Sequence, residues 1–318
     1  MSEYLWDKSG DPDPEIEALE RLLGPLGANR DARFVFPRRR NWAAMAIAAS
    51  VLLLLGVGWF ALNRKQVAWQ VSALAGTAQV TTLARGESLT TDASSRAKLE
   101  LPSVGEVEVE PNSQVGVVAM GNSEQRLNLK RGKISATIWA PPGQFIVNTP
   151  SATTVDLGCA YTLEVNGNGD ALVKVTAGWV AFESDGRESF IPATAACMTR
   201  PGKGPGTPYY EDASATLKTA VTQFDERGEM GAVAQIAVAQ IMGEARPRDA
   251  ITLWHLLRRV SVNERGPVFD RLAELIQLPA SVNRQGVVSG DARMIDALWD
   301  SLDLGDTSWW RMWKTPTR

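Results

Sequence analysis

The chain has 318 residues, which is long enough for two or three compact domains. Lys and Arg number 33 and Asp and Glu number 36, so the net charge is −3 and the composition disfavours direct nucleic-acid binding through a basic surface. Two cysteines exclude a disulfide-dense small domain and a four-cysteine zinc site. The single histidine, His255, disfavours histidine-dependent catalysis.

The segment 42–62 is an apolar stretch of 21 residues without a charged side chain. As a helix it would be about 31 Å long, which matches the hydrocarbon core of a bilayer. A cleaved signal peptide would normally begin its apolar run nearer the start of the chain and limit it to about 7–15 residues. A buried core helix is the other alternative. We therefore predict a single, retained transmembrane helix.

Basic residues flank the predicted transmembrane helix unequally. Two follow it, Arg64 and Lys65, whereas five precede it: Arg30, Arg33, Arg38, Arg39 and Arg40. Because basic residues near a span stay in the cytoplasm, we predict a cytoplasmic N-terminus and a C-terminal bulk that is periplasmic or otherwise extracytoplasmic. The expected location is the inner (cytoplasmic) membrane, where the arginines contact membrane lipid.

The cytoplasmic segment 1–41 is too short for a hydrophobic core of its own. It contains a helical pattern with Asp13 as the N-cap and Pro14 at the first helical position, and Gly24 and Pro25 are expected to end the helix. An apolar stripe at three- and four-residue spacing comprises Ile16, Leu19, Leu22, Leu23 and Leu26. Because the segment cannot bury this stripe, it must meet a partner protein, the membrane surface or water. The candidate partner contacts are Trp6, Ile16, Leu19, Leu22 and Leu23.

Between residues 67 and 200 the apolar pattern has a period of two. Short alternating runs are separated by Gly, Pro, Asn and Asp, for example 99–101, 107–109, 127–129, 134–138 and 172–175. This pattern predicts an all-β domain over 67–200, and a sandwich, a barrel or a solenoid would each fit it.

A stretch rich in proline and glycine, 201–213, is predicted to be a linker. The following part, 214–318, has a helical pattern. Helices are expected at about 215–224, 231–242, 247–260, 266–276 and 291–302. The predicted fold class is therefore a segregated α+β protein, with a transmembrane helix, an all-β domain and an α-helical C-terminal domain.

The sequence contains no recognisable enzyme signature. His255 has no partner at metal-ligand spacing and no cysteine nearby. The alternating carboxylates Glu106, Glu108 and Glu110 are expected on the solvated face of a strand. We therefore predict a non-enzymatic protein without a cofactor or a bound metal.

Cys159 and Cys197 both lie on the predicted extracytoplasmic side, where disulfide bonds persist. Each falls in a strand-like stretch of the β domain. We predict that they form a disulfide that closes a loop of about 38 residues. The alternative is two buried free thiols.

Several motifs follow one another in order along the β domain: Gly86-x-x-Leu89-x-Thr91, Ala97-x-Leu99-x-Leu101, Leu129-x-x-Gly132-x-Ile134, Phe145 to Pro150, Val155 to Val165, and Val173 to Val180. With these motifs, the segment 76–184 resembles the extracytoplasmic domain of FecR-type transmembrane sigma-factor regulators. Cys159 departs from the pattern, because the family usually has Thr there. The resemblance implies a β-solenoid-like domain outside the membrane, a single span, and a cytoplasmic segment that holds or assists a sigma factor.

Topology and resemblance together lead to one functional hypothesis. The chain is predicted to be a single-pass signalling protein that regulates an extracytoplasmic-function sigma factor in response to an envelope signal. The sigma factor is expected to contact the segment 1–41, and an envelope protein or a glycan is expected to bind outside. The alternative is an envelope scaffold whose outer domains bind proteins or glycans without any sigma-factor contact.

Overall fold

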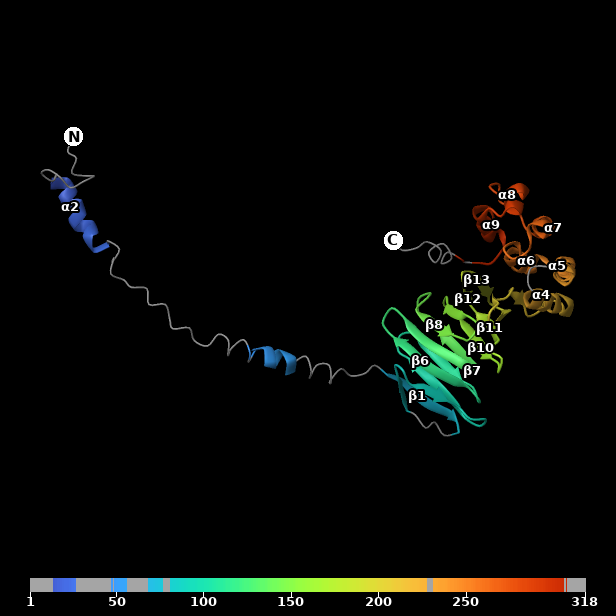
Figure 1. Cartoon of the computed structure of the whole chain (residues 1–318), viewed down its shortest axis with the longest axis horizontal. Helices are drawn as coiled ribbons and strands as arrows, with labels where there is room; N and C mark the ends of the chain where they lie inside the picture. The colour runs from blue at the N-terminus through green and yellow to red at the C-terminus, as the bar shows by residue number, and fades with distance from the viewer. Residues whose placement is uncertain are drawn as a thin grey trace. The chain divides into compact units, whose positions relative to one another are not determined.

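The computed structural model describes residues 14–26, 47, 49–55, 68–76, 81–227, 231–305 and 307. The chain divides into two compact units, Met1–Lys65 and Gln66–Arg318, and each unit is described by itself (Figure 1). The described residues of the first unit are all helical, and the second unit contains all the described strands and the remaining helices.

In the first unit, α2 (Pro14–Leu23) is followed by the 3-10 helix η1 (Gly24–Leu26). Pro14 opens the helix as expected, because the first turn needs no N–H donor at that position. The α-helix ends at Leu23, directly before Gly24 and Pro25. Asp13, the predicted N-cap, lies outside the described residues.

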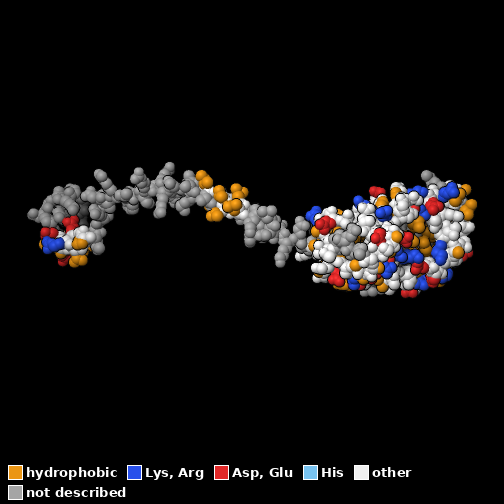
Figure 2. Space-filling model, turned by 90° about the horizontal axis from the view of Figure 1, so that it is seen from below, with side chains coloured by type: hydrophobic (Ala, Val, Ile, Leu, Met, Phe, Trp, Pro, Cys, Tyr) orange, Lys and Arg blue, Asp and Glu red, His pale blue; other side chains and the backbone are white. Residues whose placement is uncertain are grey.

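The predicted transmembrane helix 42–62 is described only at Ile47 and residues 49–55. These residues are helical, and their mostly apolar side chains are exposed (Figure 2). No helix in the described part of the chain is both long enough and apolar enough to cross a membrane. The rest of 42–62 lies outside the described residues.

In the second unit, two β-sheets share the long strand β7 (Gln125–Ile138). One sheet has the order β2 (Thr82–Ala84), β1 (Ala68–Ala75), β4 (Arg96–Leu101), β5 (Gly105–Val109), β7, β10 (Ala160–Val165), β11 (Ala171–Ala177) and β14 (Ala195–Arg200), with β15 (Gly204–Pro205) and β16 (Tyr209–Tyr210) pairing with β14. The other has the order β3 (Ser88–Thr90), β6 (Gln114–Met120), β7, β8 (Phe145–Asn148), β9 (Thr153–Asp156), β12 (Trp179–Ser184) and β13 (Arg187–Pro192).

Strand β7 belongs to both sheets because its two halves have different partners. The half 125–131 pairs with β6 and β8, and the half 132–138 pairs with β5 and β10. Gly132 lies where the halves meet, with φ at 88°, in the left-handed region that glycine tolerates best. A Cβ at this position would press on the backbone of Ser113. Gly132 therefore allows a bend inside one strand and does not form a turn between two strands.

The directions of the strands show that the predicted β-solenoid-like arrangement is wrong. A parallel β-helix stacks parallel strands, whereas among the described strand pairs only β7 and β8 run parallel. Short turns such as 166–170 join neighbouring strands directly, and such turns produce antiparallel pairs because parallel pairs need long crossovers. The β region is therefore two mostly antiparallel sheets joined through β7.

The core follows from the alternation of side chains along the strands. In β5, for example, Val107 and Val109 are fully buried, while Glu106 and Glu108 between them are half-buried. The largest fully buried side chains come from strands and helices alike and include Trp69, Phe145, Tyr161, Phe182, Phe190, Trp254 and Trp299. They enter one continuous hydrophobic core.

The segment 201–213, predicted to be a linker, is part of the packed structure. β15 and β16 both pair with β14, and Thr207 between them is fully buried. The Ser189 hydroxyl donates a hydrogen bond to the Gly206 carbonyl at 2.7 Å. The prolines and glycines of 201–213 therefore lie in tight turns along a sheet edge. The sheets and helices belong to a single compact unit.

The helical prediction for the C-terminal part is confirmed. The helices are α4 (Ala215–Arg227), α5 (Ala232–Glu244), η2 (Pro247–Asp249), α6 (Ala250–Leu257), α7 (Val262–Leu275), α8 (Arg284–Ser289), α9 (Ala292–Ala297) and η3 (Leu298–Ser301). α7 begins four residues earlier than predicted because Ser261 and Glu264 form a capping box. The helices gather beside the end of the sheets at which β12 and β13 lie (Figure 1).

Candidate functional site

The apolar stripe predicted for the N-terminal helix is present and is not buried by any described residue. Leu19, Leu22 and Leu23 expose 61%, 75% and 50% of their surface, and no residue of α2 is buried. Ile16 of the same stripe is half-buried. Trp6, the remaining predicted contact, lies outside the described residues. Within the described residues, the three leucines thus form an exposed apolar face on α2.

In the second unit, one buried arginine joins the sheets to the helices. Arg259 follows α6 and is only 4% exposed. Its guanidinium donates to the hydroxyl of Ser189 in β13 at 2.6 Å and to the hydroxyl of Thr207 at 3.0 Å. Its Nη1 atom also lies 3.7 Å from Oδ1 of Asp225 in α4. A single side chain therefore connects β13, the segment before β16, α4 and α6.

The partner carboxylate of this arginine is held by backbone and side chain together. Asp225 accepts hydrogen bonds from the N–H of Thr207 at 2.7 Å and from its hydroxyl at 2.9 Å. Burial raises the pKa of Asp225, and the charge of Arg259 opposes that shift. A Cβ at Gly206 would press on the Asp225 carboxylate and on a backbone carbonyl, so only glycine fits beside it.

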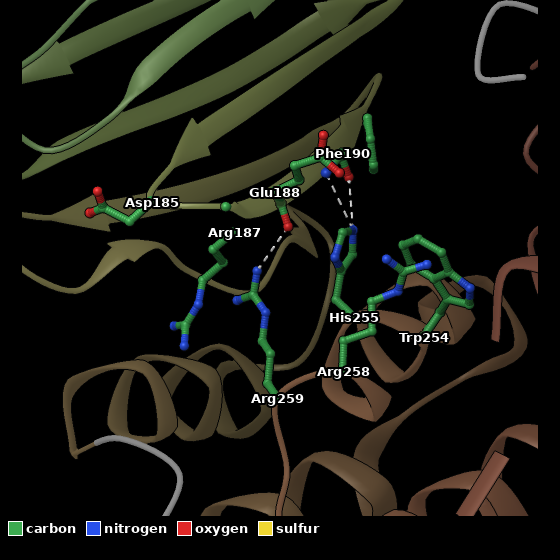
Figure 3. Close-up of a pocket in the computed structure, with 9 residues that line it drawn as sticks. Asp185, Arg187, Glu188, Phe190, Trp254, His255, Arg258 and Arg259 are labelled. Carbon is green, nitrogen blue, oxygen red and sulfur yellow. Dashed lines mark hydrogen bonds between the residues drawn. The ribbon is translucent and has the colours of Figure 1, made fainter. Parts of the chain in front are cut away.

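A cavity of about 400 Å³ lies between the turn from β12 to β13 and helix α6 (Figure 3). Its lining comprises Asp185, Gly186, Arg187, Glu188, Phe190, Trp254, His255, Arg258 and Arg259. The guanidinium carbon of Arg258 lies 4.3 Å from the ring centroid of Trp254. Three arginines and two carboxylates line the cavity, so it carries a small positive excess where the sheets meet the helices.

His255 in this cavity has a packing role. Its Nε2 atom lies 3.3 Å from both the backbone N and the backbone O of Phe190 (Figure 3). Burial and the nearby Arg259 and Arg258 charges lower the pKa of His255 well below its usual value, so the ring is neutral at pH 7. Within the described residues, no group of three or more His, Cys, Asp or Glu side chains is placed to hold a metal ion.

The residues around Arg259 are not identified by sequence reasoning, because they come from distant parts of the chain. Thr207 lies 18 positions from Asp225 and 52 positions from Arg259. One local signal points to the arginine. It follows shortly after the eight residues of α6 (Ala250–Leu257), all of which are buried, and a cation so close to a buried helix needs a partner.

The predicted disulfide between Cys159 and Cys197 is wrong, because both residues are buried free thiols. Cys197 in β14 pairs with Val173 in β11, and Val173 pairs with Leu163 in β10, which lies four residues after Cys159. Two strand spacings of about 4.8 Å and four residues of about 3.3 Å put the two Cα atoms roughly 16 Å apart. A disulfide needs a Cα separation below about 7 Å.

The strands from β3 to the start of β12 match a known protein family. Residues 87–181 match the FecR protein family. This match confirms the resemblance that the ordered motifs within 76–184 predict.

Two crystal structures of a "putative anti-sigma factor" from Parabacteroides distasonis ATCC 8503 resemble this chain with 16% sequence identity and a TM-score of 0.35. The similarity covers 43% of this chain and 65% and 64% of the two other chains, which is less than two thirds of their length. No curated protein matches the sequence.

Within the FecR region, a buried carboxyl group lies at the end of β9. Asp156 accepts hydrogen bonds from the N–H of Gly158 at 2.7 Å and from the Cys159 thiol at 2.5 Å. Burial raises the pKa of Asp156 to about 7, against the opposing effect of these hydrogen bonds. Burial and then the Asp156 charge raise the pKa of the Cys159 thiol, which stays protonated. Cys159 therefore acts as a protonated donor to the buried Asp156 carboxyl group.

Proposed function

We propose that this protein is a membrane-anchored regulator of an extracytoplasmic-function sigma factor. The observation that carries the proposal is the match of residues 87–181 to the FecR family. In this proposal the segment 42–62 anchors the chain in the inner membrane, and the segment 1–41 lies in the cytoplasm, where the sigma factor is. The second unit then receives an envelope signal outside.

The apolar face of α2 supports the N-terminal segment as the contact with the sigma factor. Leu19, Leu22 and Leu23 recur at the spacing with which an amphipathic helix fills a groove on a partner. Fully burying one leucine contributes about 1.5–3 kcal/mol, so a few such residues are a substantial source of affinity. Glu17 and Arg21 form an ion pair at 3.4 Å on the side of the helix away from the leucines, so the helix has a polar side as well.

The connection through Arg259 supports a second unit that responds as one body. The arginine bonds to Ser189 in β13 and faces Asp225 in α4. A ligand that shifts the sheets therefore also shifts the helices, because separating them would leave a buried charge without its partners. In the proposed function, the signal reaches the anchor from this whole unit.

The proposal is tested by placing two aspartates on the apolar face of α2. Full-length protein with Leu19→Asp and Leu22→Asp is co-purified with each tagged extracytoplasmic-function sigma factor of the same organism. The wild-type chain is expected to retain one of them, and the double variant is expected to lose it. Transcription from the promoters of that sigma factor is expected to change in the same strain.

A matched control changes the charge by the same amount on the other side of α2. Arg21→Glu also lowers the net charge by two, but it lies opposite Leu19 and Leu23 on the helix and leaves the leucines in place. This control is expected to retain the sigma factor, and both variants are expected to be inserted in the membrane. If the wild-type chain retains no sigma factor, or the leucine variant retains it unchanged, the proposed contact is wrong and the envelope scaffold becomes the better hypothesis.

A further inference from the structure

A second cavity, of about 440 Å³, lies in the β region and shares no lining residue with the cavity beside Arg259. The turns from β4 to β5 and from β6 to β7, and the loop from β7 to β8, meet at this cavity. Its lining comprises Trp69, Pro102, Ser103, Val104, Met120, Gly121, Asn122, Gln125 and Gln144. The volume falls in the range of about 300–1,000 Å³ that small-molecule sites occupy. None of these side chains is ionisable.

The lining combines an apolar wall with uncharged hydrogen-bonding groups. Trp69 and Val104 are buried core residues that reach the cavity, and Met120 packs against the same core. The polar side chains are the hydroxyl of Ser103 and three carboxamides, from Asn122, Gln125 and Gln144. Each carboxamide offers both donors and an acceptor.

Hydrogen bonds hold the walls of the cavity in place. The side-chain amide of Gln144 donates to the carbonyl of Asn122 at 2.5 Å, which ties the β7–β8 loop to the β6–β7 turn. The N–H of Gln125 donates to the carbonyl of Gln144 at 2.7 Å, and the N–H of Gly121 closes its turn on the carbonyl of Glu124 at 2.8 Å. The polar groups are therefore preorganised, which reduces the entropy that a ligand must offset on binding.

One polar atom of the lining is left unsatisfied. Oε1 of Gln125 is buried and has no hydrogen-bond partner. A buried acceptor without a donor costs about 1–3 kcal/mol. Because this oxygen is buried, a ligand hydroxyl in the cavity would supply the missing bond only after a flip of the amide.

Ser103 stands at a position where glycine would be easier. The N–H of Val104 donates to the carbonyl of Leu101 at 3.0 Å, and Pro102 and Ser103 are the central residues of this turn. Ser103 has a φ of 65°, which lies in the left-handed region, and a turn with Pro followed by such a residue favours Gly or Asn there. The turn thus tolerates local strain and retains a hydroxyl at the cavity, as residues at functional sites often do.

An exposed tryptophan is anchored beside the same turn. The N–H groups of Trp139 and Ala140 both donate to the carbonyl of Val104, at 2.9 and 3.1 Å. Trp139 exposes 61% of its surface, although most other tryptophans described in this unit are buried. Trp139 does not line the cavity itself, but its backbone helps to hold the turn that carries Ser103.

We propose that this cavity binds a neutral sugar unit. A charged ligand would lose its hydration without gaining a counter-charge from the lining. Sugar hydroxyls both donate and accept hydrogen bonds, as the carboxamides and Ser103 do. The C–H face of a sugar ring packs on an apolar surface, which Met120 supplies here, because Trp69 and Val104 each expose only 1% of their surface. This inference does not depend on sigma-factor regulation, because the binding is measured on the protein alone.

Isothermal titration calorimetry of the purified full-length chain tests the site. The protein is kept free of sugar-headed detergents, which would compete. The probes are maltotriose, cellotriose and triacetylchitotriose, with glucose and N-acetylglucosamine as free sugars and trigalacturonate as a charged counterpart. At least one neutral trisaccharide is expected to bind, and trigalacturonate is expected not to bind. Equal affinity for the trisaccharide and its monosaccharide indicates a free sugar as the natural ligand, and tighter binding of the trisaccharide indicates a glycan chain.

Two variants link that binding to the cavity. Gln125→Leu removes the carboxamide at nearly constant volume, and Ser103→Gly removes the hydroxyl while relieving the backbone. Each is expected to weaken binding about tenfold, which corresponds to one lost hydrogen bond of about 1.4 kcal/mol. Gln235→Leu, an exposed change on α5, is the control and is expected to bind normally. The proposal is overturned if no neutral sugar binds at millimolar concentration, if trigalacturonate binds equally well, or if a thermally stable Ser103→Gly protein binds as the wild type does.

Discussion

Arg259 and Asp225 form a buried ion pair that a hydroxyl group bridges. The Thr207 hydroxyl accepts a hydrogen bond from Arg259 at 3.0 Å and donates one to Asp225 at 2.9 Å, while the charged atoms themselves are 3.7 Å apart. The chain from cation to hydroxyl to carboxylate runs in one direction, so each polar group satisfies the next. This arrangement explains how two charges persist inside the contact between sheets and helices.

Removing the arginine from this pair is expected to destabilise the second unit. In Arg259→Met, the Asp225 carboxylate remains buried without its cation, which costs about 3–5 kcal/mol. Urea unfolding followed by circular dichroism measures the loss. The control is Arg284→Met, which removes the partner of Asp270 at a pair exposed by 57% and 50% and is expected to cost clearly less. Equal losses in the two variants would contradict a structural role for the buried pair.

The buried carboxyl of Asp156 is expected to make stability depend on pH. Its pKa is about 7 in the folded protein and about 3.8 in the unfolded chain, so the folded state binds the proton more tightly. The resulting stabilisation is complete below about pH 4 and is lost as the pH rises through about 7. Relative to Asp156→Asn, the free energy of unfolding of the wild type is expected to fall by about 4 kcal/mol over this range.

Urea titrations of both proteins at several pH values measure this difference. The contribution of His255 has the opposite sign, because its pKa is lowered by burial, and it cancels when the two profiles are subtracted. A difference that stays constant from pH 4 to pH 7 would show that Asp156 titrates normally in the folded protein.

The two cysteines are expected to be free and protected. After denaturation without a reductant, a maleimide reagent should label two thiols per chain, Cys159 and Cys197. Before denaturation, labelling at neutral pH should be very slow, because both thiols are buried and burial raises the pKa of Cys197 to about 12. If protein taken from the envelope shows no free thiol after denaturation, Cys159 and Cys197 form a disulfide after all.

Two glycines of the FecR region are expected to differ in their tolerance of alanine. Gly158 and Gly178 both have positive φ, at 87° and 72°. A Cβ at Gly158 would meet nothing within 4 Å, so Gly158→Ala is expected to cost only the backbone strain of about 1–2 kcal/mol. A Cβ at Gly178 would overlap the carbonyl oxygen of Gly158, so Gly178→Ala is expected to cost clearly more. Thermal unfolding and soluble yield compare the two variants, and equal losses would contradict the steric argument.

Local patterns are sufficient to predict most of the secondary structure, because burial follows the same period as the sequence. In β7, Ile134, Ala136 and Ile138 are buried and alternate with more exposed neighbours, as the period of two predicts. The same local pattern predicts two separate strands at 127–129 and 134–138, where the structure has the single strand β7. Spacing alone does not distinguish a glycine in a bend from a glycine in a turn. Joining the two runs requires the pairing with β5, β6, β8 and β10.

The errors at the candidate sites arise from long-range arrangement. Cys159 and Cys197 are both in or beside strands, but only the register of β10, β11 and β14 shows that they are too far apart to bond. The composition of 201–213 is typical of a linker, yet Thr207 is buried and bridges the ion pair of Arg259 and Asp225. The exposed leucines of α2, Leu19, Leu22 and Leu23, follow the predicted spacing because that spacing is a local property of one helix.

The double membership of β7 determines how cooperatively the β region unfolds. Peeling β5 or β10 away exposes one half of β7, and peeling β6 or β8 away exposes the other half, so neither sheet can open without weakening the strand that completes its neighbour. Stretches of a protein that share their hydrogen-bonded partners exchange amide protons as a single cooperative group. The amides at the centre of β7 should therefore be the slowest to exchange in the β region, and both sheets should be lost together in one transition.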